Sequence, residues 1–85
     1  MEFTITVTTN FKRFRMNVKR VYHSEQIERY EISAGEKTIT VRNNRPQVKN
    51  TRKKPGWKLE EGEIKDKQAF AMTLLEIEKY LIRED

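Results

Sequence analysis

The sequence predicts an α+β fold with two layers: an antiparallel meander sheet of four to five strands, and one C-terminal amphipathic helix packed on one face. Two observations support this prediction. Apolar and polar residues alternate with period 2 through the first half of the chain, and apolar residues recur with helical spacing near the C-terminus. Since 85 residues are too few for two stable cores, we expect a single domain over residues 1–85.

The alternation predicts four strands within about residues 2–42. Their alternating stretches are residues 3–8, 13–22, 26–33 and 38–42. Short polar segments between these stretches are expected to turn the chain, at residues 9–10, 23–25 and 34–36. In the second strand, Arg20 and Tyr22 share the parity of the apolar residues, so both are expected on the apolar face.

Each strand therefore has one apolar and one polar face. The apolar positions predict the face that the helix covers, namely Ile5, Val7, Phe14, Met16, Val18, Tyr30, Ile32, Ile39 and Val41. The other parity predicts a face open to solvent, with Thr4, Thr6, Thr8, Arg13, Arg15, Asn17, Lys19, Arg29, Glu31, Thr38, Thr40 and Arg42.

Periodicity is lost over residues 43–56, which predict a basic loop, and residues 57–60 predict a short fifth strand or a tethering segment. The last segment predicts a helix over about residues 66–83, with Asp66 as its N-cap. The expected apolar stripe consists of Phe70, Leu74, Ile77 and Leu81, widened by Ala71, Leu75 and Ile82. Met72 falls among the polar residues of the opposite helix face.

Composition excludes several kinds of site. Without Cys the chain forms no disulfide, zinc ribbon, iron–sulfur cluster or thiol nucleophile, and one His excludes a multi-histidine metal site within one chain. The sequence has no glycine-rich phosphate loop and no EF-hand spacing, so we expect no cofactor and no metal. It also has no signal-peptide pattern and no apolar run long enough to span a bilayer. We therefore expect a soluble cytoplasmic protein without a membrane partner.

Charge is distributed unevenly along the chain. The formal net charge is +5, but residues 1–58 hold 14 Lys or Arg against 5 Asp or Glu, a net of +9. Residues 59–85 hold 4 against 8, a net of −4. The predicted sheet and loop are therefore basic and the helical region is acidic, a distribution that attracts polyanions to one side.

This asymmetry predicts a non-enzymatic nucleic-acid-binding module with weak sequence preference, because phosphate contacts carry little sequence information. Either single-stranded or duplex nucleic acid could be the partner. The candidate binding residues on the open sheet face are Arg13, Arg15, Lys19, Arg29 and Arg42. The candidates in and beside the loop are Lys49, Arg52, Lys53, Lys54, Trp57 and Lys58.

Other interpretations compete with this one. A charged sheet face can serve solubility alone, and the expected open face has no aromatic residue for stacking on bases. Trp57 is either a stacking residue or a lid that closes one edge of the core, and we favour the lid. The predicted order of four strands and a helix resembles the ββββα repeat of PUR-type single-strand nucleic-acid-binding domains, and that resemblance implies a similar ligand.

The main alternative is a protein-interaction or scaffold module, acting as a homodimer or as an accessory subunit. Its partner would bind through an unpaired edge of the sheet. A small metal-free nuclease using His23 is the least favoured hypothesis, because no diagnostic spacing surrounds this residue.

Overall fold

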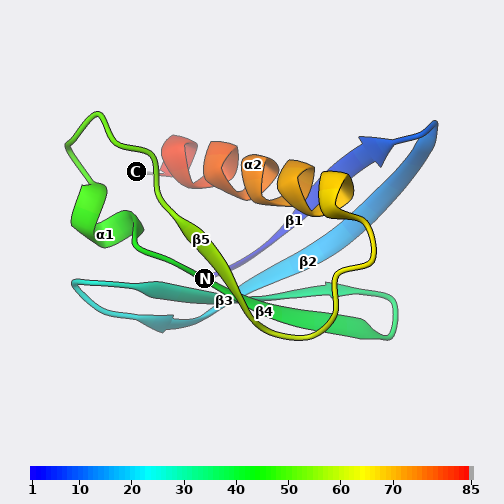
Figure 1. The fold of residues 1–85 in the computed structure, drawn as a ribbon, viewed down its shortest axis with the longest axis horizontal. Helices are drawn as coiled ribbons and strands as arrows, with labels where there is room; N and C mark the ends of the chain where they lie inside the picture. The colour runs from blue at the N-terminus through cyan, green and yellow to red at the C-terminus, as the bar shows by residue number, and fades with distance from the viewer. Residues whose placement is uncertain (85) are drawn as a thin grey trace.

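The computed structural model describes residues 1–84 and confirms the predicted α+β fold. It has five strands, β1 (Glu2–Thr9), β2 (Lys12–His23), β3 (Glu28–Ala34), β4 (Lys37–Asn43) and β5 (Trp57–Glu61), with two helices, α1 (Arg45–Val48) and α2 (Lys67–Glu84). The strands form one antiparallel sheet in the order β1-β2-β3-β4-β5, and α2 lies against one face (Figure 1).

The core lies between α2 and the apolar face of the sheet. Its buried hydrophobic side chains are Phe3, Ile5, Val7, Val18, Tyr30, Ile32, Val41, Ile77 and Leu81. Most of these are the alternating positions of the sequence pattern. The alternation predicts Phe14 there too, but it is 40% exposed because it lies close to the end of the β1–β2 hairpin.

Helix α2 begins as predicted. The Asp66 carboxylate accepts hydrogen bonds from the backbone N–H groups of Gln68, at 3.0 Å, and Ala69, at 3.1 Å. These are donors that the first helical turn leaves without intrahelical partners, so Asp66 is the N-cap.

The buried face of α2 differs from the predicted stripe on both flanks. Thr73 is buried together with Ile77 and Leu81, and its hydroxyl donates to the Ala69 carbonyl at 2.8 Å. Met72 packs against the core instead of lying on a polar face, whereas Leu75 is 49% and Ile82 74% exposed. The whole buried stripe is therefore rotated towards β1, where Tyr80 stacks on Phe3 with ring centroids 3.8 Å apart.

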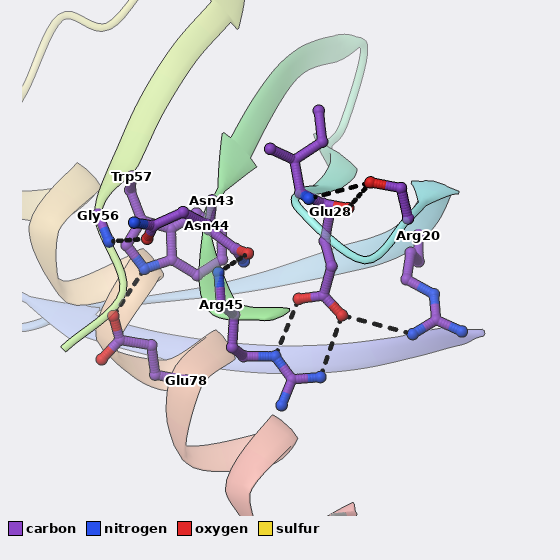
Figure 2. Close-up of polar contacts among 10 residues, drawn as sticks. Arg20, Glu28, Asn43, Asn44, Arg45, Gly56, Trp57 and Glu78 are labelled. Carbon is purple, nitrogen blue, oxygen red and sulfur yellow. Dashed lines mark hydrogen bonds and ion pairs between the residues drawn. The ribbon is translucent and has the colours of Figure 1, made fainter. Parts of the chain in front are cut away.

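Contacts with both outer strands hold α2 over the sheet. Tyr80 contacts β1 through Phe3, and on the other side Glu78 accepts a 2.6 Å hydrogen bond from the Trp57 indole Nε1 of β5 (Figure 2). Trp57 also packs at a tilt against Tyr30, with centroids 6.1 Å apart. Its position therefore agrees with the predicted lid on the core.

The segment predicted as a basic loop contains a short helix. Pro46 occupies one of the first positions of α1, where its fixed φ is suited and its missing N–H is no loss. Asn44, just before α1, is hydrogen-bonded to the end of the loop: its side-chain oxygen accepts a 2.7 Å bond from the Gly56 N–H (Figure 2). The chain enters β5 from this fixed point, and the predicted fifth strand is confirmed over Trp57–Glu61.

Candidate functional site

A register shift in β2 changes the composition of the open sheet face. Arg20 pairs with Tyr30, but Tyr22 pairs with Arg29, so Val21 is an extra residue between the two pairs. After an extra residue, every following side chain of the strand lies on the face opposite to the one that simple alternation predicts. The expectation that Tyr22 lies on the apolar face is therefore wrong, and so is the expectation that the open face has no aromatic residue.

Tyr22 belongs to a row of side chains that crosses the open face. Its neighbours in register are Arg29 on β3, Arg42 on β4 and Lys58 on β5. The guanidinium of Arg29 lies 4.8 Å from the centroid of the Tyr22 ring, a cation–π distance, and the tyrosine remains 46% exposed. The row therefore combines an accessible ring with three cations, the pair of properties that phosphate and base recognition requires.

Glu60 partly neutralises this row. A second register shift, in β5, makes Glu60 an extra residue, and its carboxylate lies 2.7 Å from Arg29 Nε and 3.9 Å from Arg42 Nη1. Side-chain exposures of 34% for Arg29 and 39% for Arg42 leave both ion pairs open to solvent, which weakens them.

The middle of the open face is not basic. Lys19 lies between Glu2 on β1 and Glu31 on β3 in the strand register, and Thr40 and Glu61 continue that row. The next row is uncharged, with Thr4, Asn17, Ser33 and Thr38. Lys19 therefore does not connect the predicted cations into one continuous stripe.

Arg13 and Arg15 form a second basic group at the other end of the open face. They lie opposite Thr8 and Thr6 of β1, both residues are exposed, and neither forms an ion pair within residues 1–84. At a strand rise of 3.3 Å per residue, about 20 Å separates Arg15 from Tyr22. This exceeds the screening length of about 10 Å at 0.1 M salt, so the two groups act as separate sites.

The β1–β2 turn adds an aromatic ring next to Arg13 and Arg15. Asn10 and Phe11 are the two loop residues, with φ values of +49° and +64°. Two positive φ values define the hairpin turn that favours Asn-Gly, and a side chain in this region typically costs about 1–2 kcal/mol. Phe11 has a relative exposure of 106%, so no packing offsets this cost.

The loop cations lie on the helix side of the molecule. A hollow between the loop and α2 is lined by Lys49, Lys53 and Lys54 together with Glu78 and Ile82 of the helix. Figure 1 shows the α1–β5 loop beside the C-terminal part of α2, with the sheet below. The loop cluster that includes Arg52 therefore does not extend the open face, and exposed Lys58 on β5 lies at the edge between the two.

Two further arginines form ion pairs with one buried carboxylate. Glu28 is 1% exposed on the helix side of β3, and Arg45 donates to it from Nε at 2.9 Å and from Nη2 at 3.0 Å. Arg20 lies 3.5 Å from the same carboxylate. Burial raises the pKa of Glu28, but the bonds from Arg45 outweigh burial, so the carboxyl has a pKa below its ordinary value.

Sequence reasoning missed three residues that define these surfaces. Phe11 could have been noticed, since Asn-Phe stands where a two-residue hairpin favours Asn-Gly. Tyr22 and Glu60 carry no such signal, because their positions depend on extra residues in the strand pairing. Trp57, a predicted binding residue, is half-buried on the helix side and bonded to Glu78, away from the open-face cations.

Over residues 1–84, no group of three or more His, Cys, Asp or Glu side chains is placed to hold a metal ion. In the same range neither helix is long and apolar enough to cross a bilayer. Comparisons with protein-family models, with curated proteins and with solved structures find no match to this chain.

Proposed function

We propose that the chain is a small non-enzymatic module that binds nucleic acid through its open sheet face, with weak sequence preference. The observation that carries the proposal is the row that begins with Tyr22 and Arg29, where an exposed ring lies among cations. Arg13 and Arg15 provide a second phosphate-binding group on the same face. The proposal includes the cytoplasmic location predicted from the sequence.

The spacing of the two basic groups favours an extended ligand. A single nucleotide cannot contact both groups, since they lie about 20 Å apart at the rise of a strand. At about 3.4 Å per stacked nucleotide, that distance corresponds to roughly six nucleotides of one strand. The uncharged and acidic rows between the groups would then face bases or sugars rather than phosphates. Oligonucleotides of increasing length should therefore bind more tightly up to about this size.

Fluorescence anisotropy with labelled single-stranded DNA, duplex DNA and RNA tests the proposal. We expect micromolar or tighter binding at about 50 mM salt and a steep loss of affinity as salt is raised. No binding of any of the three at that salt concentration would refute nucleic-acid binding, because phosphate contacts are strongest there.

Matched variants locate the surface. Arg13→Gln with Arg15→Gln should weaken binding and reduce the salt slope by about 0.7 per lost contact on a single strand. Lys65→Gln with Lys67→Gln removes the same charge next to the start of α2 and should have little effect. A triple Gln variant of Arg52, Lys53 and Lys54 tests the loop separately. Unchanged binding in both variants would exclude the Arg13–Arg15 group and the loop as binding surfaces.

The second candidate function is protein binding through the unpaired edge of β1. After Glu2 this edge strand carries no charged residue through Thr9, and edges without charge or Pro are prone to pair with another strand. A homodimer or a complex with an extended peptide would use this edge. Sedimentation at two protein concentrations and two salt concentrations tests the homodimer, and a monomer under all four conditions would count against it.

A further inference from the structure

The tip of the β1–β2 hairpin carries a side chain that the fold does not use. Gly at position 11 would suit the positive φ and would remove the exposed ring. Phe11 therefore opposes folding through its backbone conformation, and because its ring stays as exposed as in an unfolded chain, no burial offsets that cost. Breaks of a local rule without structural compensation are typical of functional positions.

The surroundings of Phe11 are basic. Residues 3–24 contain no Asp or Glu and five cations: Lys12, Arg13 and Arg15 near the turn, and Lys19 and Arg20 in the half of β2 away from it. The first three directly follow the turn and are exposed. The tip lies at the periphery of the molecule, where the hairpin extends past the start of α2 (Figure 1). Arg13 and Arg15 share the open face of the sheet next to the turn, so a ligand on that face can reach both cations and the tip.

We propose that Phe11 stacks on an unpaired base of a nucleic acid while Arg13 and Arg15 bind phosphates of the same strand. This inference rests on the proposed function and deepens it, because it names the unpaired base as the target. A nucleic acid supplies anionic groups and flat apolar faces within one molecule, in agreement with the ring and the cations at the tip.

An unpaired base fits the tip better than a paired one. Insertion of a ring between paired bases requires them to unstack, whereas a single strand or a frayed end already exposes base faces. A bilayer is also a poorer match, because binding at a lipid surface scales with the apolar area inserted. Phe11 is the only large apolar side chain of residues 1–84 that is more than 75% exposed.

The test uses a single-stranded oligonucleotide of about ten nucleotides with one central 2-aminopurine, whose fluorescence reports stacking. Wild-type protein should change this fluorescence, and Phe11→Gly should reduce the change and weaken binding about tenfold. The salt slope of Phe11→Gly should stay that of the wild type, since no phosphate contact is lost. Phe11→Tyr keeps a ring and should restore both signals.

Phe14→Leu is the matched control, because it removes a ring of the same hairpin from the opposite face of the sheet. It should leave the 2-aminopurine signal unchanged. Phe11→Gly should unfold at a higher temperature than the wild type, so a loss of binding cannot be ascribed to unfolding.

The outcomes separate the two proposals. If wild-type protein binds none of the oligonucleotides at about 50 mM salt, the proposed function fails, and this inference fails with it. If the wild type binds and Phe11→Gly binds equally with the same fluorescence, only the role of Phe11 is refuted. Unchanged oligonucleotide binding with a loss of binding to vesicles containing anionic lipid would also refute it, and would assign the tip to membranes.

Discussion

Arg45 donates two hydrogen bonds to the carboxylate of Glu28, from Nε at 2.9 Å and from Nη2 at 3.0 Å (Figure 2). The two residues are 17 positions apart, and the pair joins the start of β3 to the start of α1. Because Glu28 is 1% exposed, an uncompensated charge there would be costly, and Arg45 provides the compensation. This contact fixes where the basic loop leaves the sheet.

We predict that acid destabilises the protein through Glu28. Its pKa in the folded state is below the ordinary value of 4.5, so the stability it contributes is present above that pH and is lost as pH falls further. Urea unfolding between pH 7 and pH 3 measures this loss. In Glu28→Gln the stability at pH 7 should be lower and the decline towards pH 3 shallower. Equal declines in both proteins would contradict the role of Glu28.

We predict that Tyr30 makes the protein sensitive to alkali. Burial and the neighbouring charge of Glu28 raise the pKa of Tyr30 above 10.0, so unfolding is favoured as pH rises above that value. Tyr30→Phe removes only the hydroxyl and should change stability at pH 7 by about 1 kcal/mol. It should also reduce the alkaline loss in urea titrations at pH 9 and pH 11, and an unchanged loss would refute this.

We predict that Gly62→Ala is strongly destabilising. A Cβ atom at Gly62 would lie 2.6 Å from Ile39 Cγ2 and 3.1 Å from Ile39 Cα, and the φ of Gly62 is +100°. Overlap and backbone strain together should lower the free energy of unfolding by about 2 kcal/mol or more.

Gly56→Ala is the matched control for Gly62. A Cβ there would meet its nearest atom, Asn44 Oδ1, at 3.7 Å, which is ordinary contact, and its φ is not positive. The change should be within about 0.5 kcal/mol of wild type. Thermal unfolding of both variants under one condition gives the comparison, and similar values for the two would contradict the packing of Gly62 against Ile39.

We predict that the Trp57–Glu78 bond holds β5 against α2. Glu78→Gln keeps an acceptor but removes its charge, and Glu78→Leu removes the acceptor from a half-buried indole. Glu78→Leu should lower the free energy of unfolding by about 1–3 kcal/mol, and Glu78→Gln should lower it by less. Chemical denaturation monitored by Trp57 fluorescence measures both. Equal losses in the two variants would mean that the hydrogen bond is not the stabilising contact.

Much of the fold could be predicted because its signals are local. Alternation predicts that Ile5 and Val7 lie on the buried face, and the residues that follow Asp66 indicate that it is an N-cap; the structure confirms both. The rotation of the α2 stripe could not be predicted. Helical spacing permits several adjacent faces, and contact with β1 selects the one that includes Thr73 and Tyr80.

The strands, the C-terminal helix and the separation of basic from acidic segments follow from the amino-acid sequence, because their signals are local. Which charges and rings share a surface depends on the tertiary structure. One extra residue in β2 moves Tyr22 to the open face, and another in β5 brings Glu60 to Arg29. Parity along a strand is a local property, but it holds only while the pairing is regular, and pairing depends on partners far along the chain.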